Sequence, residues 1–327
     1  MGAEVPAAVT TVGMVGRAST NRMLHAAGVL PAVGPGGLLV LLARGRTRDD
    51  AVSSQSWSEA LSGLDSSSVA VVTADEPRLV DLASASGARV VTFGFSELAD
   101  VRATDIESSS QGTLFSAVLA GSSHRVRLAL LGEHLVTSAI ASLAAAHALG
   151  VPLGDAIEGL EALDATGTAT MEPLRRPDGL LVIDDAASAT AASTAAALKT
   201  LAVIGMEGRR TVAVLGELDG DGAASSVEEE DELNRELHDR IGRLVVRLNV
   251  KKLVVVGHDA RHIHNAAGLE GSWDGESILV NGPEQAYDLL RDELDAGDVV
   301  LVKSSRDGGL QGLAARLASG PVQGVAS

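Results

Sequence analysis

The sequence predicts an α/β protein of two domains, and three observations point to this class. Short apolar runs alternate with stretches of helical length along most of the 327 residues, which is typical of parallel sheets covered by helices. Apolar residues make up 46% of the chain, enough to bury one or two cores, and two domains are the better expectation at this length. The alternation lapses once, near residues 164–173 (DATGTATMEP). We therefore place the domain boundary there, between residues 1–165 and residues 166–327.

The first half begins with alternating strands and helices and then changes character. Runs such as GGLLVLLA are apolar throughout, as in strands buried on both faces. The expected strands are residues 9–15, 36–43, 68–73 and 88–95, and the expected helices are residues 19–27, 49–63 and 76–86. Three short antiparallel strands, linked by Ser/Gly-rich turns, are expected next at residues 99–104, 113–120 and 125–131. Two helices follow at residues 134–149 and 153–163, the second just after Pro152, where proline is tolerated.

The second half predicts a compact, doubly wound domain with a mostly parallel sheet. Its first strand ends in Asp184 and Asp185 and leads through a turn of small residues into an alanine-rich helix. The expected strands are residues 180–183, 211–215, 252–256, 277–280 and 299–302. Each strand is followed by a helix, at residues 191–201, 229–248, 259–267, 283–293 and 309–317. Ligands bind such sheets at the carboxyl ends of the strands, so candidate binding residues are sought there.

Charge and composition exclude several classes of function. The formal net charge of −17 would repel nucleic-acid phosphates and anionic membrane surfaces, so neither is expected as a partner. The chain has no cysteine, which excludes disulfides, thiolate metal sites and cysteine nucleophiles. It shows neither a signal peptide nor an apolar run of the roughly 18 to 20 residues that a membrane span needs. The expected location is the cytoplasm, without membrane insertion.

A phosphate-binding loop is the first chemical motif to look for, and its pattern is incomplete. Residues 13–21 (GMVGRASTN) lie between a predicted strand and a predicted helix, but they lack the closing glycine and the lysine of such loops. The four lysines of the chain are Lys199, Lys251, Lys252 and Lys303. Chemistry that needs a lysine in the first half is therefore excluded.

Two other groups of polar residues are weak candidates for a metal site. His258 and His262 are four residues apart and could share a helix face and bind a metal, with His264 close by. A polar helix surface is the better interpretation, since no further ligand is predicted on that face. The acids Asp219, Asp221, Glu228, Glu229, Glu230 and Asp231 similarly fit a solvated loop and a helix N-terminus better than a cation site. No metal site and no GxSxG nucleophile motif is predicted.

Several segments, taken in order, resemble the MurF branch of the Mur ligase family. They are residues 73–77 (TADEP), 132–134 (GEH), 139–146, 149–152 (LGVP), 171–172 (ME), 182–185 (VIDD), 214–218 (VLGEL) and 301–306 (LVKSSR). The resemblance extends from about Val12 to Leu317. It implies a partial Mur ligase central domain with a degenerate phosphate loop, followed by a Rossmann-like C-terminal domain. Family members use ATP and Mg²⁺ to add D-alanyl-D-alanine to the UDP-N-acetylmuramoyl tripeptide of peptidoglycan synthesis.

The departures from the family fall on its chemistry. Ser19, Thr20 and Asn21 stand where the family has Gly, Lys and Thr. No His, Glu or Lys lies between Gly36 and Ser58, where the family has a metal-binding histidine and a carbamylated lysine. The family's nucleotide clamp is altered at Leu135, Ser138, Thr170, Ala186, Ala187, Ser188, Thr190 and Ala191, and we do not expect the family's UDP-sugar domain in this chain. Phosphoryl transfer depends on positioning and charge neutralisation, so we expect ligase activity and the binding of ATP and Mg²⁺ to be lost. No cofactor is expected.

Six residues at family motifs are retained and are the candidate ligand-binding residues: His134, Asp184, Asp185, Glu217, Lys303 and Arg306. An equally good interpretation is that they are strand-end residues that hold the interdomain geometry. We therefore predict a MurF-like pseudoenzyme that works by binding, with a complete Mur ligase or another cell-wall enzyme as its partner. The first alternative is a split or diverged amide ligase completed by another chain. The second is a small-molecule sensor that retains binding of D-alanyl-D-alanine.

Overall fold

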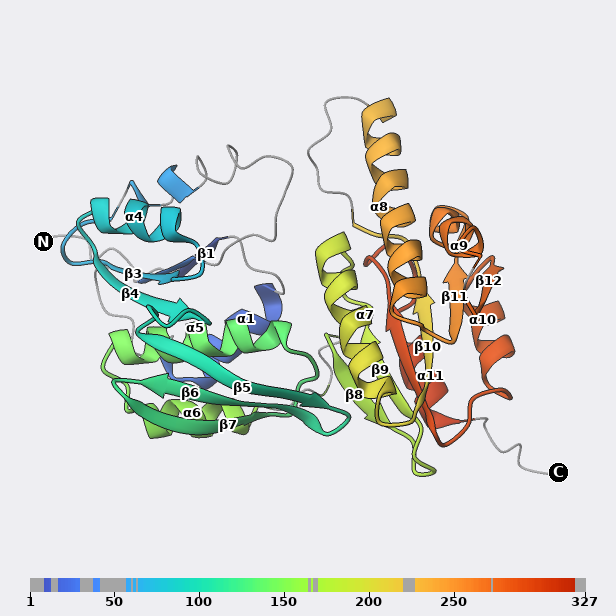
Figure 1. Ribbon diagram of the computed structural model, residues 1–327, viewed down its shortest axis with the longest axis horizontal. Coiled ribbons are helices and arrows are strands. Elements are labelled where there is room, and N and C mark those ends of the chain that lie inside the picture. Colours follow the sequence, from blue (N-terminus) through green and yellow to red (C-terminus); the bar gives the residue numbers. More distant parts are fainter. Residues whose placement is uncertain are drawn as a thin grey trace, which may run out of the picture. The chain divides into compact units, whose positions relative to one another are not determined.

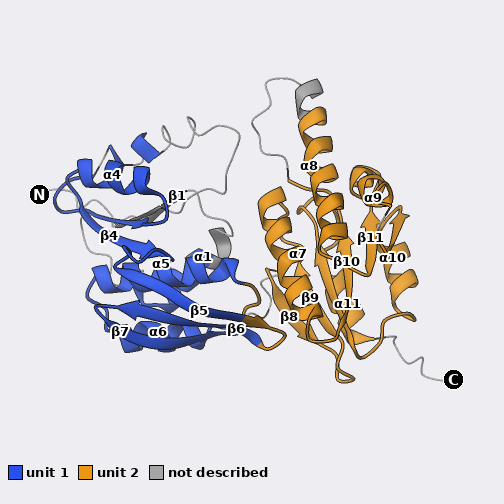
Figure 2. Ribbon diagram, in the orientation of Figure 1, with its two compact units in different colours: residues 1–107, 112–129, 133–164 blue, residues 108–111, 130–132, 165–327 orange. Residues whose placement is uncertain are grey.

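The computed structural model describes residues 9–12, 17–29, 38–41, 57–59, 61–62, 64–163, 166, 170–219, 227–271 and 273–320. These residues belong to two compact α/β units, shown in Figures 1 and 2. Unit 1 comprises residues 1–107, 112–129 and 133–164. Unit 2 comprises residues 108–111, 130–132 and 165–327. Each unit has its own sheet and its own helices, so the chain has the predicted α/β class.

Unit 1 is built on a seven-stranded sheet in which neighbours in sequence are neighbours in space. The strands are β1 (Val9–Val12), β2 (Leu38–Leu41), β3 (Val69–Thr73), β4 (Arg89–Gly94), β5 (Val101–Ser109), β6 (Gly112–Leu119) and β7 (Ser122–Leu128). Its helices are α1 (Arg17–Ala26), α4 (Pro77–Ala85), α5 (His134–Ala148) and α6 (Leu153–Glu161). The antiparallel pairing expected among the strands after residue 99 is seen between β6 and β7, and β5 joins this group to the rest of the sheet by pairing parallel with β4. The predicted helix at residues 49–63 lies largely outside the described residues.

Helices cover both faces of the β3–β4 region because these strands are apolar on both sides. Ala70 and Val72 of β3 pack in one cluster with Leu79 of α4 and with Trp57. On the other face, α5 packs against β3 and β4, and nearly all of its side chains are buried. Its many alanines allow it to approach the sheet closely, as the small-residue composition of the segment predicts.

Unit 2 has a six-stranded sheet in the order β12-β11-β10-β13-β9-β8. The strands are β8 (Glu172–Arg175), β9 (Leu181–Asp185), β10 (Arg210–Leu215), β11 (Lys252–Val256), β12 (Glu276–Val280) and β13 (Asp298–Lys303). The helices are α7 (Ala191–Gly205), α8 (Val227–Arg247), α9 (Arg261–Gly268), α10 (Pro283–Leu290) and α11 (Leu313–Ser319). All strand pairs are parallel except β8 with β9. The mostly parallel sheet is as predicted, and the antiparallel edge strand β8 is an addition to it.

Two predictions for unit 2 are corrected by the backbone. Strand β8 was not expected, because Glu-Pro-Leu-Arg lacks a strand pattern; its proline is tolerated at a sheet edge. Helix α11 begins at Leu313 rather than at residue 309, since Gly309 and Gly312 have φ angles of +70° and +80°, a conformation that a helix does not contain.

Strand β13 lies at the topological switch point of unit 2, where the connections that follow neighbouring strands run to opposite faces of the sheet. Helices α7 and α8 follow β9 and β10 and lie with α9 over one face, while α10 and α11 lie over the other, where they bury Val182, Val212, Val254 and Val300 (Figure 1). Strand β13 lies between β9 and β10, but the helix that follows it covers the opposite face. Such a switch point is where open α/β sheets hold their ligands. The carboxyl ends of β9, β13 and β10 are therefore the place to look for a site.

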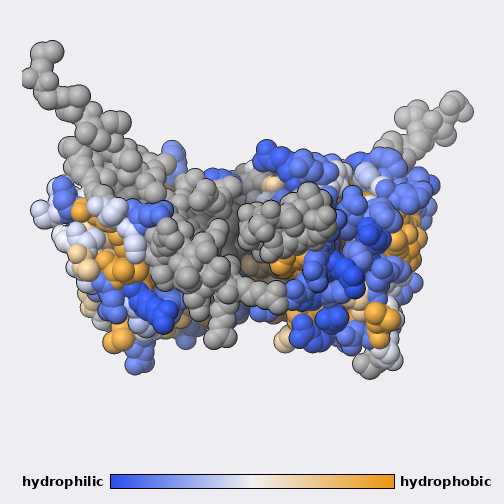
Figure 3. All heavy atoms as spheres, turned by 90° about the horizontal axis from the view of Figure 1, so that it is seen from above, coloured by the Kyte–Doolittle hydropathy of each residue, from blue (hydrophilic) through white to orange (hydrophobic). Residues whose placement is uncertain are grey.

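The surface of the described residues is mixed. In Figure 3, apolar patches are scattered among hydrophilic side chains, and the exposed large apolar residues are Phe95, Leu98, Met206, Leu269 and Leu279. Isolated apolar residues of this kind are normal on a folded protein. No helix of the described residues has the length and apolar character that crossing a membrane requires.

Candidate functional site

Lys303, the last residue of β13, forms a buried ion pair at the switch point. In register it lies between Asp185 of β9 and Leu215 of β10. Its Nζ is 2.6 Å from Oδ2 of Asp185 and 2.8 Å from the carbonyl oxygen of Ser188, to which it donates. Lys303 is 2% exposed and Asp185 is 5% exposed. Lys303 therefore neutralises Asp185 and holds the β9–α7 turn at the same time.

Asp185 uses its second carboxylate oxygen to hold the entry to β8. Its Oδ1 accepts a hydrogen bond from the backbone N–H of Met171 at 3.2 Å, and Met171 has a φ angle of +48°. Burial raises the pKa of Asp185 to about 6, although Lys303 and the Met171 amide act in the opposite direction. The carboxylate is thus tied to two other segments, and its ionisation depends on Lys303.

Asp184 has different surroundings from Asp185 because successive side chains of a strand point to opposite faces. It lies opposite Glu172 of the antiparallel strand β8, and both side chains are buried. Its Oδ1 accepts a hydrogen bond of 3.2 Å from the backbone N–H of Ala186. Burial raises the pKa of Asp184, and the negative charge of Glu172 raises it further. The two neighbouring aspartates therefore do not form one paired carboxylate site.

Glu217 and Arg306 lie at the same edge of the sheet, after β10 and β13. The carbonyl oxygen of Glu217 accepts a 2.8 Å hydrogen bond from Ser305 N. Burial raises the pKa of the half-buried Glu217 carboxyl, and the carboxylates of Asp259, Asp307 and Asp219 raise it further. Arg306 is exposed. The surroundings of Glu217 are therefore acidic and repel a phosphate group.

Asp219 belongs to the site, although its sequence position suggested a solvated loop. Its Oδ2 accepts hydrogen bonds from Ala189 N at 2.5 Å and from Ser188 Oγ at 2.9 Å, and its own N–H donates to Ala189 O at 2.8 Å. Asp219 therefore fastens the loop after β10 to the β9–α7 turn. No local pattern shows this, because the two segments are 30 residues apart. Asp221 and the side chains of residues 228–230 lie outside what the structure describes.

His134, the remaining candidate, is in unit 1, where it is the half-buried first residue of α5. Close to it, two residues that replace family residues contact each other. Thr20 Oγ1 is 2.8 Å from Ser138 Oγ, and the two residues are 0% and 1% exposed. By the resemblance given above, Thr20 stands at the family's phosphate-loop lysine and Ser138 at one of its asparagines. Both positions are occupied here by small side chains whose hydroxyl groups form a hydrogen bond with each other.

The histidines considered for a metal do not share a helix face. Helix α9 begins at Arg261, so His258 precedes it and only His262 and His264 are helical. His264 Nδ1 lies 2.7 Å from Ser277 Oγ. Within the described part of the chain, no group of three or more His, Asp or Glu side chains could hold a metal ion.

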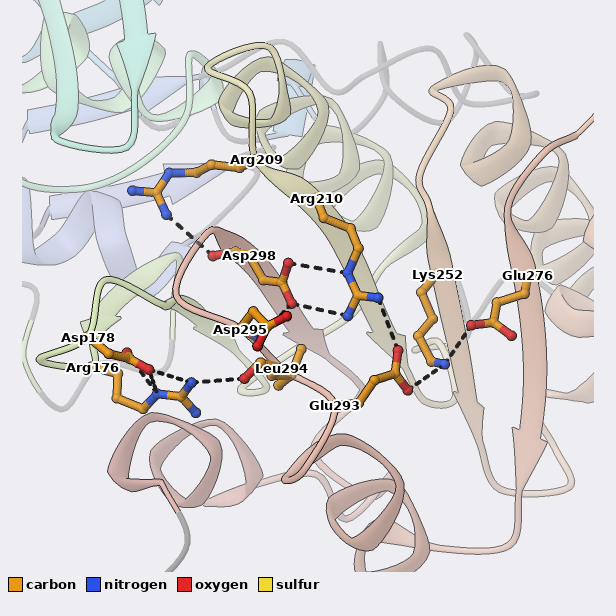
Figure 4. Close-up of polar contacts among 10 residues, drawn as sticks. All are labelled: Arg176, Asp178, Arg209, Arg210, Lys252, Glu276, Glu293, Leu294, Asp295 and Asp298. Carbon is orange, nitrogen blue, oxygen red and sulfur yellow. Dashed lines mark hydrogen bonds and ion pairs between the residues drawn. The ribbon is translucent and has the colours of Figure 1, made fainter.

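A second polar cluster lies at the amino ends of the unit 2 strands, away from the switch point (Figure 4). Glu293 forms ion pairs with Arg210, at 3.1 Å, and with Lys252, at 2.7 Å. Arg210 also pairs with Asp298, and Lys252 also pairs with Glu276. The Lys252 side chain is 4% exposed. Burial alone would lower the pKa of Lys252, but its two glutamate partners raise it above its usual value. Since each charge has an opposite partner here, the cluster links the strand starts and offers no free group to a ligand.

Two family models match the chain in sequence. "Mur ligase middle domain" matches residues 55–146, and "Mur ligase, glutamate ligase domain" matches residues 171–306. The UDP-N-acetylmuramoyl-tripeptide–D-alanyl-D-alanine ligase of Mycobacterium tuberculosis is 36% identical over 265 residues, which are 76% of this chain and 50% of the relative. The Bacillus subtilis ligase of the same name is 25% identical over 264 residues, or 81% of this chain and 54% of the relative. The chain thus spans about half the length of the curated relatives it matches.

Solved structures agree with this fold. A crystal structure of MurF from Acinetobacter baumannii has a TM-score of 0.75 at 22% identity and covers 95% of this chain and 76% of its own. MurF from Thermotoga maritima, solved in complex with ADP, has a TM-score of 0.73 at 17% identity, with 95% and 79% covered. The model of the middle domain matches residues mostly in unit 1, and the model of the glutamate ligase domain matches residues in unit 2. The strand ends of unit 2 carry several of the segments that resemble MurF. On these grounds, the chain is a MurF-like member of the Mur ligase family.

Proposed function

We propose that this chain is a MurF-like protein without ligase activity that acts by binding, as a regulatory or partner protein of peptidoglycan synthesis in the cytoplasm. The observation that carries the proposal is the buried Thr20–Ser138 contact. A phosphate loop needs a cation at the position of Thr20, and a buried hydroxyl that already has a partner cannot neutralise a polyphosphate.

The switch point of unit 2 supports the same proposal. Its lysine, Lys303, is committed to Asp185 and to the Ser188 carbonyl. The carboxylates around Glu217 would repel the phosphates of a nucleotide. Lys303, the buried cation at this edge, is therefore already committed and does not offer its charge to a nucleotide, and we derive no phosphoryl-transfer step from these residues. The proposed partner is a complete Mur ligase or another cell-wall enzyme, rather than a nucleic acid.

Calorimetric titration with ATP and Mg²⁺ tests the loss of the nucleotide site. We expect no saturable heat and no thermal stabilisation, while a catalytically competent MurF measured in parallel should show both. Saturable binding would overturn the proposal. Pull-down with purified Mur ligases then tests the partner, and we expect a stable complex with at least one of them.

The second candidate function is a split or diverged amide ligase completed by another chain. The observation that favours it is that models of the Mur ligase middle domain and of the glutamate ligase domain both match the chain, at residues 55–146 and 171–306. The assay uses UDP-N-acetylmuramoyl-tripeptide, D-alanyl-D-alanine and ATP, the substrates that the relatives' name and the family resemblance suggest. Phosphate release that requires both this chain and a second protein would favour this candidate over the first.

A further inference from the structure

His238, in the middle of α8, is held in a single protonation state by two backbone groups. The residue is 3% exposed. Its Nε2 lies 3.3 Å from Leu218 N, and its Nδ1 lies 2.6 Å from Asn234 O. A backbone N–H can only donate, so Nε2 must be the unprotonated nitrogen, and Nδ1 carries the proton that it donates to Asn234 O. The geometry therefore requires a neutral imidazole with its proton on Nδ1.

The loop that His238 holds, residues 216–219, connects several elements at the switch point. Gly216 N donates to Lys303 O at 2.9 Å, and Glu217 O accepts from Ser305 N at 2.8 Å. Asp219 binds the β9–α7 turn through Ala189. Leu218 N is the group that binds α8, through His238. A change at the imidazole is thus positioned to affect β13, the β9–α7 turn and α8 together.

Several charged and titratable groups surround this imidazole. Those that act on the ring electrostatically are His262 of α9, Asp259 just before α9 and Asp239 of α8 itself. The helices packed against α8 also carry Lys199 of α7 and Arg261 and His264 of α9. Burial lowers the pKa of His238, and His262 lowers it further, while Asn234 O and the carboxylates of Asp239 and Asp259 act in the opposite direction. Since the folded-state pKa is lowered, the neutral ring stabilises the fold above the ordinary histidine pKa, and this contribution is lost as the pH falls.

We propose that His238 is a pH-sensitive latch that fixes the loop of residues 216–219 to α8 and releases it on protonation. A protonated ring presents N–H groups at both nitrogens, so the Leu218 N–H loses its acceptor and meets a donor instead. The charged ring is also buried at a cost. Protonation therefore releases the loop from α8 and, through Asp219, loosens the β9–α7 turn. His238 is a positioning residue for the switch point, and this role does not depend on which ligand the protein binds.

NMR of the full-length, ¹⁵N-labelled protein tests the latch. Long-range ¹H–¹⁵N spectra give the imidazole tautomer, and amide exchange gives the protection of Leu218 between about pH 7.5 and about pH 4.5. We expect the Nδ1–H tautomer and a pKa below the ordinary value. As His238 titrates, the protection factor of Leu218 should fall by roughly 2- to 10-fold, the effect of losing one hydrogen bond.

Three variants separate the latch from a packing role. The side-chain carbonyl of His238→Gln can accept the Leu218 hydrogen bond but does not titrate, so protection should stay high across the pH range. His238→Ala should lower protection at every pH. His264→Gln, which alters a histidine bonded to Ser277 instead, should behave as the wild type. An Nε2–H tautomer, or Leu218 protection that does not follow the titration of His238, would overturn the proposal even if His238→Ala fails to fold.

Discussion

Removing the Lys303 ammonium should destabilise unit 2 strongly. In Lys303→Met the side chain keeps its approximate volume, but the Asp185 carboxylate, which lies 2.6 Å from Nζ, is left buried without a cation. Breaking a buried ion pair by deleting one partner costs about 3–5 kcal/mol of unfolding free energy. The Ser188 carbonyl also loses a donor, so we expect a loss in the upper part of this range.

A double-mutant cycle shows whether the pair is the cause. Asp185→Asn alone leaves the ammonium of Lys303 buried and unpaired, so it should also destabilise the protein. The double variant removes both charges, and replacing a buried pair by neutral groups is often close to neutral. We therefore expect the double variant to recover most of the loss, with a coupling energy of about 3 kcal/mol between the two sites.

Urea unfolding followed by tryptophan fluorescence measures these differences. The chain has two tryptophans, so a Trp57→Phe background leaves Trp273 as the reporter of unit 2. Lys251→Met is the matched control, since Lys251 pairs with Asp274, whose side chain is 70% exposed, and such pairs contribute about 1 kcal/mol or less. If Lys303→Met costs no more than this control, or if the double variant loses the sum of the single losses, the described role of the ion pair is wrong.

The same pair has a predicted pH dependence. Burial raises the pKa of Asp185 from 3.8 to about 6, so between these values the folded state binds a proton that the unfolded state does not. The resulting stability is fully present below pH 3.8 and is lost as the pH rises through about 6. Asp185→Asn should lack this component. A difference in unfolding free energy between the two proteins that stays constant over this pH range would contradict the assignment.

The remaining predictions concern other parts of the fold. Lys252→Met should cost no more than about 1 kcal/mol, because the Glu276 side chain is 58% exposed and Glu293 keeps Arg210 as a partner; a loss of about 3 kcal/mol or more would show that this network behaves as a buried one. Gly216→Ala should cost about 1–3 kcal/mol of unfolding free energy, since its Cβ would lie 2.8 Å from a neighbouring serine carbon. Gly297→Ala, whose Cβ would have nothing within 4 Å, should change the unfolding free energy by less than about 0.5 kcal/mol. Equal losses in the two variants would refute this reasoning. Asp75→Ala removes the carboxylate that accepts from the amides of residues 95–96, so these amides should exchange faster, and unchanged exchange would show that another group holds the loop.

Local patterns in the sequence were sufficient for most of the elements. The central strands of unit 2 are apolar on both faces, so runs such as residues 252–256 identify them directly, and β11 has the predicted bounds. Strand β8 was not predicted from the sequence, because its four residues have no strand pattern and form a strand only by pairing with β9. The start of α11 was placed too early because residue type alone does not show that Gly309 and Gly312 adopt positive φ angles.

The candidate site could be located from the sequence but not assembled from it. Asp185 and Lys303 were each identified at a strand end, yet their pairing depends on β13 lying beside β9, and this follows from the strand order. The contacts of Asp219, His238 and Thr20 likewise join residues that are 20 or more positions apart. Hydrophobic periodicity carries no information about such contacts, because it reports only which face of an element is buried.

The internal partners of these residues bear on what the protein can bind. A ligand site has to offer polar groups that are not already satisfied, because a ligand that replaces an internal hydrogen bond gains little. In the described part of the chain, Ser108 Oγ and Thr194 Oγ1 are the buried side-chain atoms without a partner. The buried groups at the switch point are instead satisfied by one another, and Thr20 and Ser138 are satisfied in the same way in unit 1. The proposal of a scaffold that presents its surface to a partner, rather than one that encloses a nucleotide, rests on this arrangement, and the ATP titration and the Mur ligase pull-down test it.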